Sequence, residues 1–137
     1  MAEAFGNAFL LERGLEEKFI VKSRGITDNF EPENSPASEQ GIIVMKTEFG
    51  IDTASHRSKI ISEEDVESAT ILIGVTRSHA GILAKSFPFY AHKITHLDRD
   101  ISDPWHQSVD VYEECAEQMY PLVTSVLSSI VENDRSK

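Results

Sequence analysis

Residues 70–75 read Thr-Ile-Leu-Ile-Gly-Val, a short and almost continuous apolar run. A strand with this pattern is typically buried on both faces, as in a parallel sheet that helices cover. Helical patterns stand on either side of the run, and residues 93–97 show a second short strand pattern. The stretch therefore predicts an α/β fold, a three-layer sandwich in which a parallel sheet is flanked by helices.

The rest of the chain continues this alternation, with start and stop signals at several expected ends. Ser35 and Pro36 are typical of an N-cap followed by the first helical residue, and Ser62 with Asp65 resembles a capping box. Pro121 lies inside the last helical pattern and is expected to kink or split that helix. Helices are expected over residues 1–13, 35–49, 62–69, 78–87 and from 108, and strands over residues 18–22, 70–75 and 93–97.

Length and charge limit the possible classes of protein. The 137 residues are enough for one domain, residues 1–137, that needs no disulfides. With 23 acidic and 13 basic residues the net charge is −10, which argues against a nucleic-acid partner. No apolar run is long enough to cross a membrane, and the N-terminus lacks a signal-peptide pattern. A single cysteine cannot form an internal disulfide, so we expect a cytoplasmic protein.

The stretch around Asp103 contains the candidate catalytic group. Pro104 fixes its own φ and favours extended geometry at Asp103, so we expect the carboxyl group on a short, rigid loop before a helix. The apolar wall of Trp105 beside that carboxyl group suits a general acid. The alternative is an ordinary turn, which Asp-Pro often begins. Like Ser23 and Thr76, Asp103 follows an expected strand end, where parallel sheets bind their ligands.

Short motifs occur in order along the chain and cover nearly its whole length. They are Met1-Ala2-Glu3-Ala4-Phe5, Ser23-Arg24-Gly25, Ser35-Pro36, Phe49-Gly50-Ile51-Asp52, His56-Arg57-Ser58-Lys59 and Asp103-Pro104-Trp105. No single motif is specific, but the ordered set resembles the low-molecular-weight protein tyrosine phosphatases and, more distantly, the related arsenate reductases.

This resemblance implies a parallel sheet of strand order 2-1-3-4 and hydrolysis of a phosphotyrosine protein or a small aryl phosphate through a cysteinyl-phosphate, without a cofactor or metal. It implies that Asp103 is the general acid and that Trp105 walls the substrate. Ser23 and His56 correspond to the residues that hydrogen-bond an asparagine of the phosphate-binding loop and hold its shape.

In the family that loop has the pattern C-x5-R and comes immediately before Met-Ala-Glu-Ala, which here begins at Met1. The comparison therefore implies that the first, central strand and the loop are missing and that the chain as given is inactive. Cys115 does not replace the nucleophile, because Pro121 stands where the arginine would be and neighbouring glutamates disfavour a thiolate. We interpret it as a small core residue. Unpaired strand edges would favour a homodimer through the sheet.

Three functions remain open: a truncated phosphatase, a catalytically dead relative that binds partners, and an unrelated acidic α/β signalling module. A signalling module of the receiver type would carry an acidic pair at the end of its first strand. Here the first expected strand ends in Lys22, Ser23 and Arg24, so this third function is disfavoured. Arg24 could aid anion binding, although a surface arginine is the simpler interpretation. His92 and His96, at even spacing on an expected strand, are interpreted as a surface pair and not as a metal site.

Overall fold

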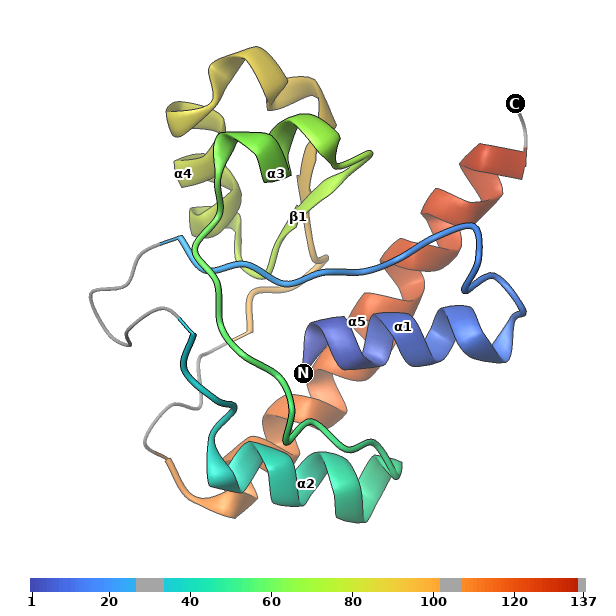
Figure 1. Ribbon diagram of the computed structural model, residues 1–137, viewed down its shortest axis with the longest axis vertical. Coiled ribbons are helices and arrows are strands. Elements are labelled where there is room, and N and C mark those ends of the chain that lie inside the picture. The colour runs from blue at the N-terminus through green and yellow to red at the C-terminus, as the bar shows by residue number, and fades with distance from the viewer. Residues whose placement is uncertain (27–33, 102–106, 136–137) are drawn as a thin grey trace.

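The computed structural model describes residues 1–26, 34–101 and 107–135. In chain order the elements are α1 (Ala2–Glu12), α2 (Glu39–Phe49), α3 (Glu63–Ser68), β1 (Leu72–Gly74), α4 (Arg77–Ser86), the 3-10 helix η1 (Pro88–Lys93), β2 (Ile94–His96) and α5 (Val109–Arg135). β1 and β2 pair in parallel, so the predicted α/β class is confirmed (Figure 1). None of the helices in these ranges is long and apolar enough to cross a membrane.

The strand β1 lies between α4 and the main core. Gly74 faces α4, since a Cβ atom there would lie 2.7 Å from the backbone nitrogen of Ala80. Ile73 and Val75 pack on the other side, against the hydrophobic core to which α5 contributes. Because side chains alternate between the two faces of a strand, helices cover both faces of this small sheet.

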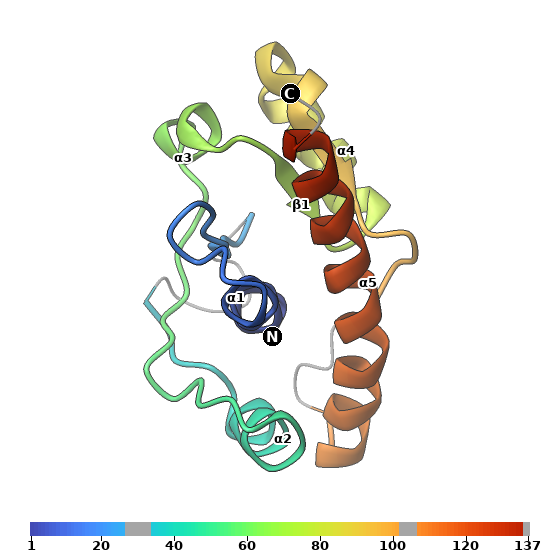
Figure 2. The same ribbon diagram turned by 90° about the vertical axis from the view of Figure 1, so that its right-hand side faces the viewer.

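The helix α5 supplies a large part of the core, and α1 and α2 pack against it; α1, seen end-on in Figure 2, crosses α5. Phe5 of α1 and Met45 of α2 are buried against it. The buried side chains of α5 are Tyr112, Cys115, Ala116, Met119, Val123, Leu127 and Val131. The cavity described below borders this core, and α5 therefore forms part of its floor.

The helix α5 also continues through Pro121, so the predicted split is not observed. Proline removes the N–H group that would bond to the carbonyl of Glu117. Both Pro121 and Glu117 are exposed, so water can hydrate that carbonyl group.

Residues 18–22 do not form the predicted strand, and the described part of the sheet has two strands instead of the expected three. The side-chain amide of Asn7 on α1 donates to the carbonyl of Val21 and accepts its N–H, both at 2.9 Å. An α1 side chain thus bonds the groups that a neighbouring strand would have paired. After a turn at residues 16–18 the chain runs on as an extended trace (Figure 1), and Gly25 forms only an isolated parallel bridge with Ile60.

The second helix begins later than predicted. Ser38 is its N-cap, and the Ser38 hydroxyl accepts the N–H of Gly41 at 3.2 Å. Pro36 instead forms an isolated antiparallel bridge with Arg57, which ties this segment to the loop after α2. The capping box predicted from Ser62 is confirmed at the start of α3.

Candidate functional site

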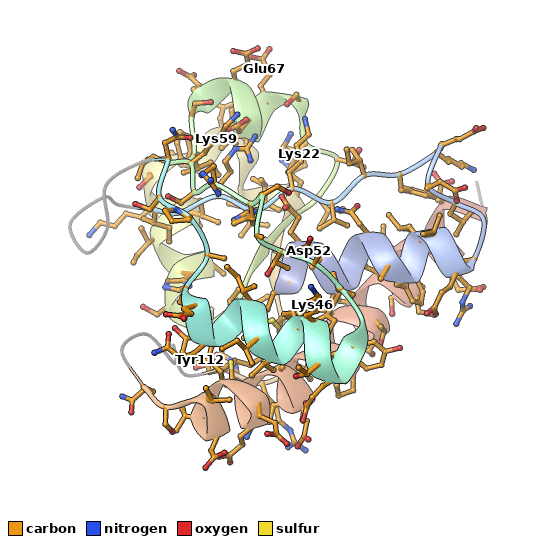
Figure 3. All side chains as sticks on the ribbon, turned by 60° about the horizontal axis from the view of Figure 1, so that its bottom comes forward. Lys22, Lys46, Asp52, Lys59, Glu67 and Tyr112 are labelled. Atoms are coloured by element: carbon orange, nitrogen blue, oxygen red, sulfur yellow. The ribbon has the colours of Figure 1, made fainter. Side chains whose placement is uncertain are left out.

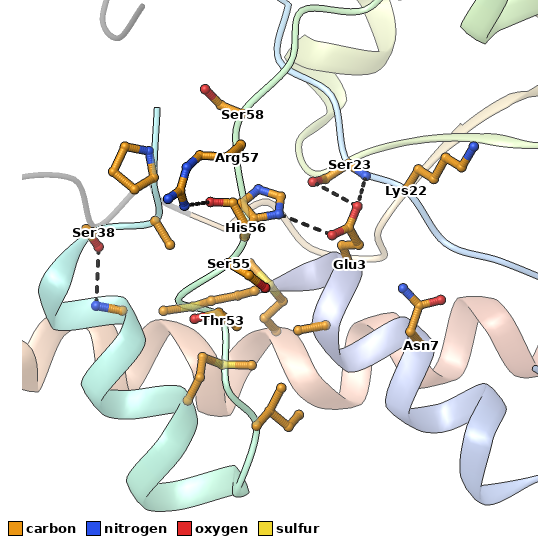
Figure 4. A pocket seen from close by; sticks show the side chains of 18 of the residues that line it. Glu3, Asn7, Lys22, Ser23, Ser38, Thr53, Ser55, His56, Arg57 and Ser58 are labelled. Carbon is orange, nitrogen blue, oxygen red and sulfur yellow. Dashed lines mark hydrogen bonds and ion pairs between the residues drawn. The ribbon is translucent and has the colours of Figure 1, made fainter. Parts of the chain in front are cut away.

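A cavity of about 1390 Å³ opens between α1, the extended segment that follows it and the loop after α2 (Figure 4). Its apolar floor includes Met45 of α2 and Met119 of α5, while polar side chains form its wall. Two of the predicted site residues, Ser23 and His56, belong to this wall. The structure therefore brings together two residues that are far apart in the sequence.

Glu3 connects these two residues. Its Oε1 accepts the backbone N–H of Ser23 at 2.8 Å and lies 3.4 Å from the Ser23 hydroxyl. Its Oε2 lies 3.2 Å from Nδ1 of His56, as Figure 4 shows. In the described residues the partner shared by Ser23 and His56 is thus the Glu3 carboxylate, where the resemblance implied an asparagine.

Local structure positions each member of this network. Glu3 lies in the first turn of α1, where the helix dipole favours a negative charge. Gly50 ends α2 in the left-handed conformation, with φ of 67°. Asp52 then accepts the N–H of Ala54 at 2.9 Å, which forms a turn and directs His56 towards the cavity.

Sequence reasoning missed Glu3 as a site residue, although a signal for it exists. Glu3 and Asn7 are separated by one helical turn and lie on the same side of α1. The structure shows that both bind backbone groups of the segment after α1, at Ser23 and Val21. Two polar residues at this spacing on a mostly apolar helix could have indicated a second polar surface.

Arg24, next to Ser23, is held in a fixed position. Its Nε donates to Oδ2 of Asp65 at 3.0 Å, and its Nη1 donates to the Ser23 carbonyl at 2.7 Å. Asp65 is also the N3 residue of the capping box that begins α3. Desolvation raises the pKa of Asp65, but hydrogen bonds from the Ser62 N–H and from Arg24 outweigh this effect and hold the pKa below its usual value.

Cys115 is buried in the core of α5, as predicted, and its side chain borders the cavity floor. Asp103 and Trp105, the predicted general acid and aromatic wall, lie outside the described residues. Their roles therefore stay predictions. Ile101, the last described residue before them, is buried in the core cluster.

A group of three carboxylates lies away from the wall of the cavity. Glu48 of α2 and Glu113 and Glu117 of α5 have carboxylate oxygens within 4.8 Å of one another. A hydrogen bond with Glu113, together with desolvation and repulsion between the carboxylates, raises the pKa of Glu48 to about 7. Sequence reasoning did not find this group, because packing of α2 on α5 creates it.

The predicted histidine pair is not on one strand. His92 belongs to η1 and His96 to β2, where its Nδ1 lies 2.8 Å from the Leu97 carbonyl. The two imidazole rings therefore do not lie on the same face of one strand, as the even spacing had predicted. Neither belongs to the one group of possible metal ligands found in the described part of the chain.

Fold and cavity together define an α/β protein with a polar site beside a parallel sheet. The family model of the low molecular weight phosphotyrosine protein phosphatases matches residues 1–136, and the chain belongs to this family. The chain is 31% identical, over 85% of its length and 80% of the relative's, to a protein-arginine-phosphatase of Geobacillus stearothermophilus. It is 25% identical to the protein-arginine-phosphatase of Bacillus subtilis, over 98% of this chain and 90% of that one. The crystal structure of a low molecular weight protein tyrosine phosphatase from T. tengcongensis aligns with a TM-score of 0.83 at 33% identity, covering 93% of this chain and 88% of that chain.

Proposed function

We propose that this chain is a phosphatase-family domain for phosphorylated protein side chains, and that the 137 residues as given do not turn over substrate. The observation that carries the proposal is the cavity wall, where Ser23 and His56 share Glu3 in a chain of this family. In the proposed site Asp103 protonates the leaving group and Trp105 walls the substrate.

The expected inactivity follows from the chemistry that the family needs. Its mechanism requires a thiolate nucleophile and an arginine that binds the transferring phosphoryl group. Cys115 is the single cysteine of the sequence, it is buried on α5, and Pro121 stands where C-x5-R would have arginine. The 137 residues given therefore contain no thiolate nucleophile and no C-x5-R arginine at the candidate site.

Turnover by the purified chain tests this proposal. We expect only trace hydrolysis of an aryl phosphate and of a phosphoarginine peptide, and the same trace for Cys115→Ala. Both substrates belong in the assay because the relatives include phosphatases named for arginine and for tyrosine. Robust turnover that vanadate inhibits would contradict the proposal, and its loss in Cys115→Ala would identify Cys115 as the nucleophile.

A second candidate function is binding of a partner without catalysis, and the size of the cavity favours it. About 1390 Å³ exceeds the roughly 300–1,000 Å³ of a typical small-molecule pocket. Trp105 is the single tryptophan of the chain, so its fluorescence can report binding next to Asp103. We expect a phosphotyrosine peptide to change this fluorescence saturably, and the unphosphorylated peptide to have no such effect.

Two further features belong to the proposal. Within the described residues β1 is paired only with β2, so its second edge is open to a homodimer. Sedimentation velocity at several concentrations tests this, because a dimer would dissociate on dilution.

We also propose a cytoplasmic location, since the sequence has a single cysteine and no disulfide is possible within the chain.

A further inference from the structure

The 23 acidic residues of the chain are distributed unevenly along it. Residues 68–97 contain none of them, and no longer stretch of the sequence is without an acidic residue. The same stretch forms β1, α4, η1 and β2, and it carries lysine, arginine and three of the five histidines of the chain. These basic residues are Arg77, Lys85, Lys93, His79, His92 and His96. In a chain of net charge −10 these elements therefore form a locally positive unit.

The 3-10 helix η1 holds an aromatic ring in solvent. Phe89 is 88% exposed, which is the largest exposed fraction of any large apolar side chain in the described residues. Its ring lies 6.4 Å from that of Tyr90, and Nζ of Lys93 lies 4.9 Å from the Tyr90 ring. The same Nζ donates to the carbonyl groups of Glu67 and Ala69 at the end of α3. Lys93 thus fixes η1 to its neighbour, while the Phe89 ring remains without apolar cover.

The helix α4 packs against η1 and adds an apolar side chain and a cation to this exposed surface. Ile82 is 43% exposed, and Lys85 follows it at a spacing that places both on one side of the helix. Among residues 1–26, 34–101 and 107–135, no carboxylate oxygen lies within 4.0 Å of the Lys85 ammonium group. We call Ile82, Lys85, Phe89 and the exposed His92 the α4–η1 surface.

The position of the α4–η1 surface limits what can cover it. The helix η1 is the yellow segment at the top of Figures 1 and 2, at the end of the molecule opposite α2. None of the four residues of the surface lines the cavity described above. Next to it, α3 carries the four acids Glu63, Glu64, Asp65 and Glu67, and Figure 3 shows Glu67 pointing outwards from this helix. The positive field is therefore confined to α4 and η1.

This confinement favours a short acidic segment over an extended anionic surface. A lipid bilayer with anionic headgroups would also face the carboxylates of α3, and the net charge of −10 would repel it. A short segment of a partner protein meets only the α4–η1 surface, because exposed charges farther away than about 8 Å are screened at physiological ionic strength.

We propose that the α4–η1 surface docks an acidic segment of a partner protein. An apolar side chain of that segment packs on Phe89 and Ile82, and its carboxylates lie near Lys85 and His92. Buried aromatic side chains are frequent anchors of interfaces, and complementary charge selects the partner. The surface lies outside the cavity, so the proposal goes beyond the phosphatase-family function and does not depend on it.

The probe is a short soluble peptide with leucines among aspartates, and the measurement is the set of amide chemical shifts of the isotopically labelled full chain. We expect saturable shifts at residues 82–93 that weaken as the salt concentration rises. The same peptide with serines in place of the aspartates should bind much more weakly. These two peptides differ in charge and keep the same leucines.

Two variants with matched controls assign the contact to this surface. Phe89→Ala should weaken binding roughly five- to tenfold, as loss of an aromatic anchor does, whereas Ile20→Ala at a 72% exposed position should have no effect. Lys85→Gln should weaken binding about two- to fivefold, as loss of an exposed ion pair does. Its control is Lys46→Gln, which removes the same charge from the last turn of α2 (Figure 3). Phe89 and Lys85 are exposed, so both variants should keep the thermal midpoint of the parent.

Several outcomes would overturn the proposal. One is the absence of saturable shifts at residues 82–93, and another is equal binding of the aspartate and serine peptides. Equal weakening by Lys85→Gln and Lys46→Gln would mean that net charge alone attracts the peptide. Cosedimentation with phosphatidylserine vesicles, lost in Phe89→Ala, would assign the surface to a membrane instead. Shifts at residues 82–93 that depend on protein concentration without any peptide, and that are lost in Phe89→Ala, would assign it to a second copy of the chain.

Discussion

At the scale of single residues, one carboxylate organises the candidate site. Glu3 bonds the backbone of Ser23 and pairs with His56, and these contacts connect α1 to two segments that carry no regular structure of their own. A hydrogen bond to a charged group contributes more than a neutral one, and its loss leaves a donor without a partner. Glu3 is therefore a positioning residue as well as a surface acid.

We expect Glu3→Ala to lower the free energy of unfolding by about 1–2 kcal/mol, since the Ser23 N–H loses its acceptor. Glu3→Gln should cost less, because its side-chain oxygen still accepts that hydrogen bond. Chemical denaturation measures both changes. Glu12→Ala, at an exposed position near the end of the same helix, is the control and should stay within about 0.5 kcal/mol of the parent. An equal effect of Glu3→Ala and Glu12→Ala would mean that the network is not stabilising.

At the scale of elements, close packing of β1 on α4 fixes the small sheet. A Cβ atom at Gly74 would lie 2.7 Å from the Ala80 nitrogen and 2.9 Å from the Thr76 carbonyl oxygen, both of them backbone atoms. Backbone atoms in the first turn of a helix cannot move aside as a flexible side chain does. Glycine at this position is therefore required by the approach of the two elements.

Gly74→Ala should destabilise the protein by about 1–3 kcal/mol or more, as overpacking of a core does. Gly81→Ala is the matched control on α4, where a Cβ atom would meet nothing within 4 Å. Because alanine favours a helix interior over glycine, this control should stabilise the protein by about 0.5–1 kcal/mol. Opposite signs of the two shifts in thermal midpoint are the expected result. A tolerated Gly74→Ala would show that β1 and α4 can separate.

At the scale of the whole molecule, packing of α2 on α5 gives the protein a pH-sensitive contact. The pKa of Glu48 rises from 4.5 to about 7 next to Glu113 and Glu117. A carboxyl group with a raised pKa binds more protons in the folded state than in the unfolded state. Its contribution to stability is therefore present below about pH 4.5 and is lost as the pH rises through about 7.

Denaturant midpoints should thus be lower at about pH 8 than at about pH 5, and Glu48→Gln should reduce this difference. Glu39→Gln removes a carboxylate from an exposed position at the other end of α2 and should leave the pH dependence unchanged. The contact would be ruled out if both variants kept the full pH dependence of the parent.

Sequence alone determined the fold class, the family and the order of the five α-helices and of the strands at residues 70–75 and 93–97, because each rests on local chemistry. The apolar run at 70–75, the capping box at Ser62 and the ordered motifs are all readable without contacts. Ser23 and His56 could also be named in advance as candidates, and both line the cavity, but their role in supporting a phosphate loop stays a prediction. The strand predicted at 18–22 failed because pairing is not local: Asn7 on α1 takes both backbone groups of Val21.

Only the tertiary structure decided which polar groups meet. Glu3 between Ser23 and His56, Arg24 held by the capping residue Asp65, and Glu48 against Glu113 all join segments distant in sequence. Residue type states what a side chain can bind, but the packing of α1, α2 and α3 determines its partner. Burial and neighbouring charge then determine the pKa and the strength of each contact, and both arise only on folding.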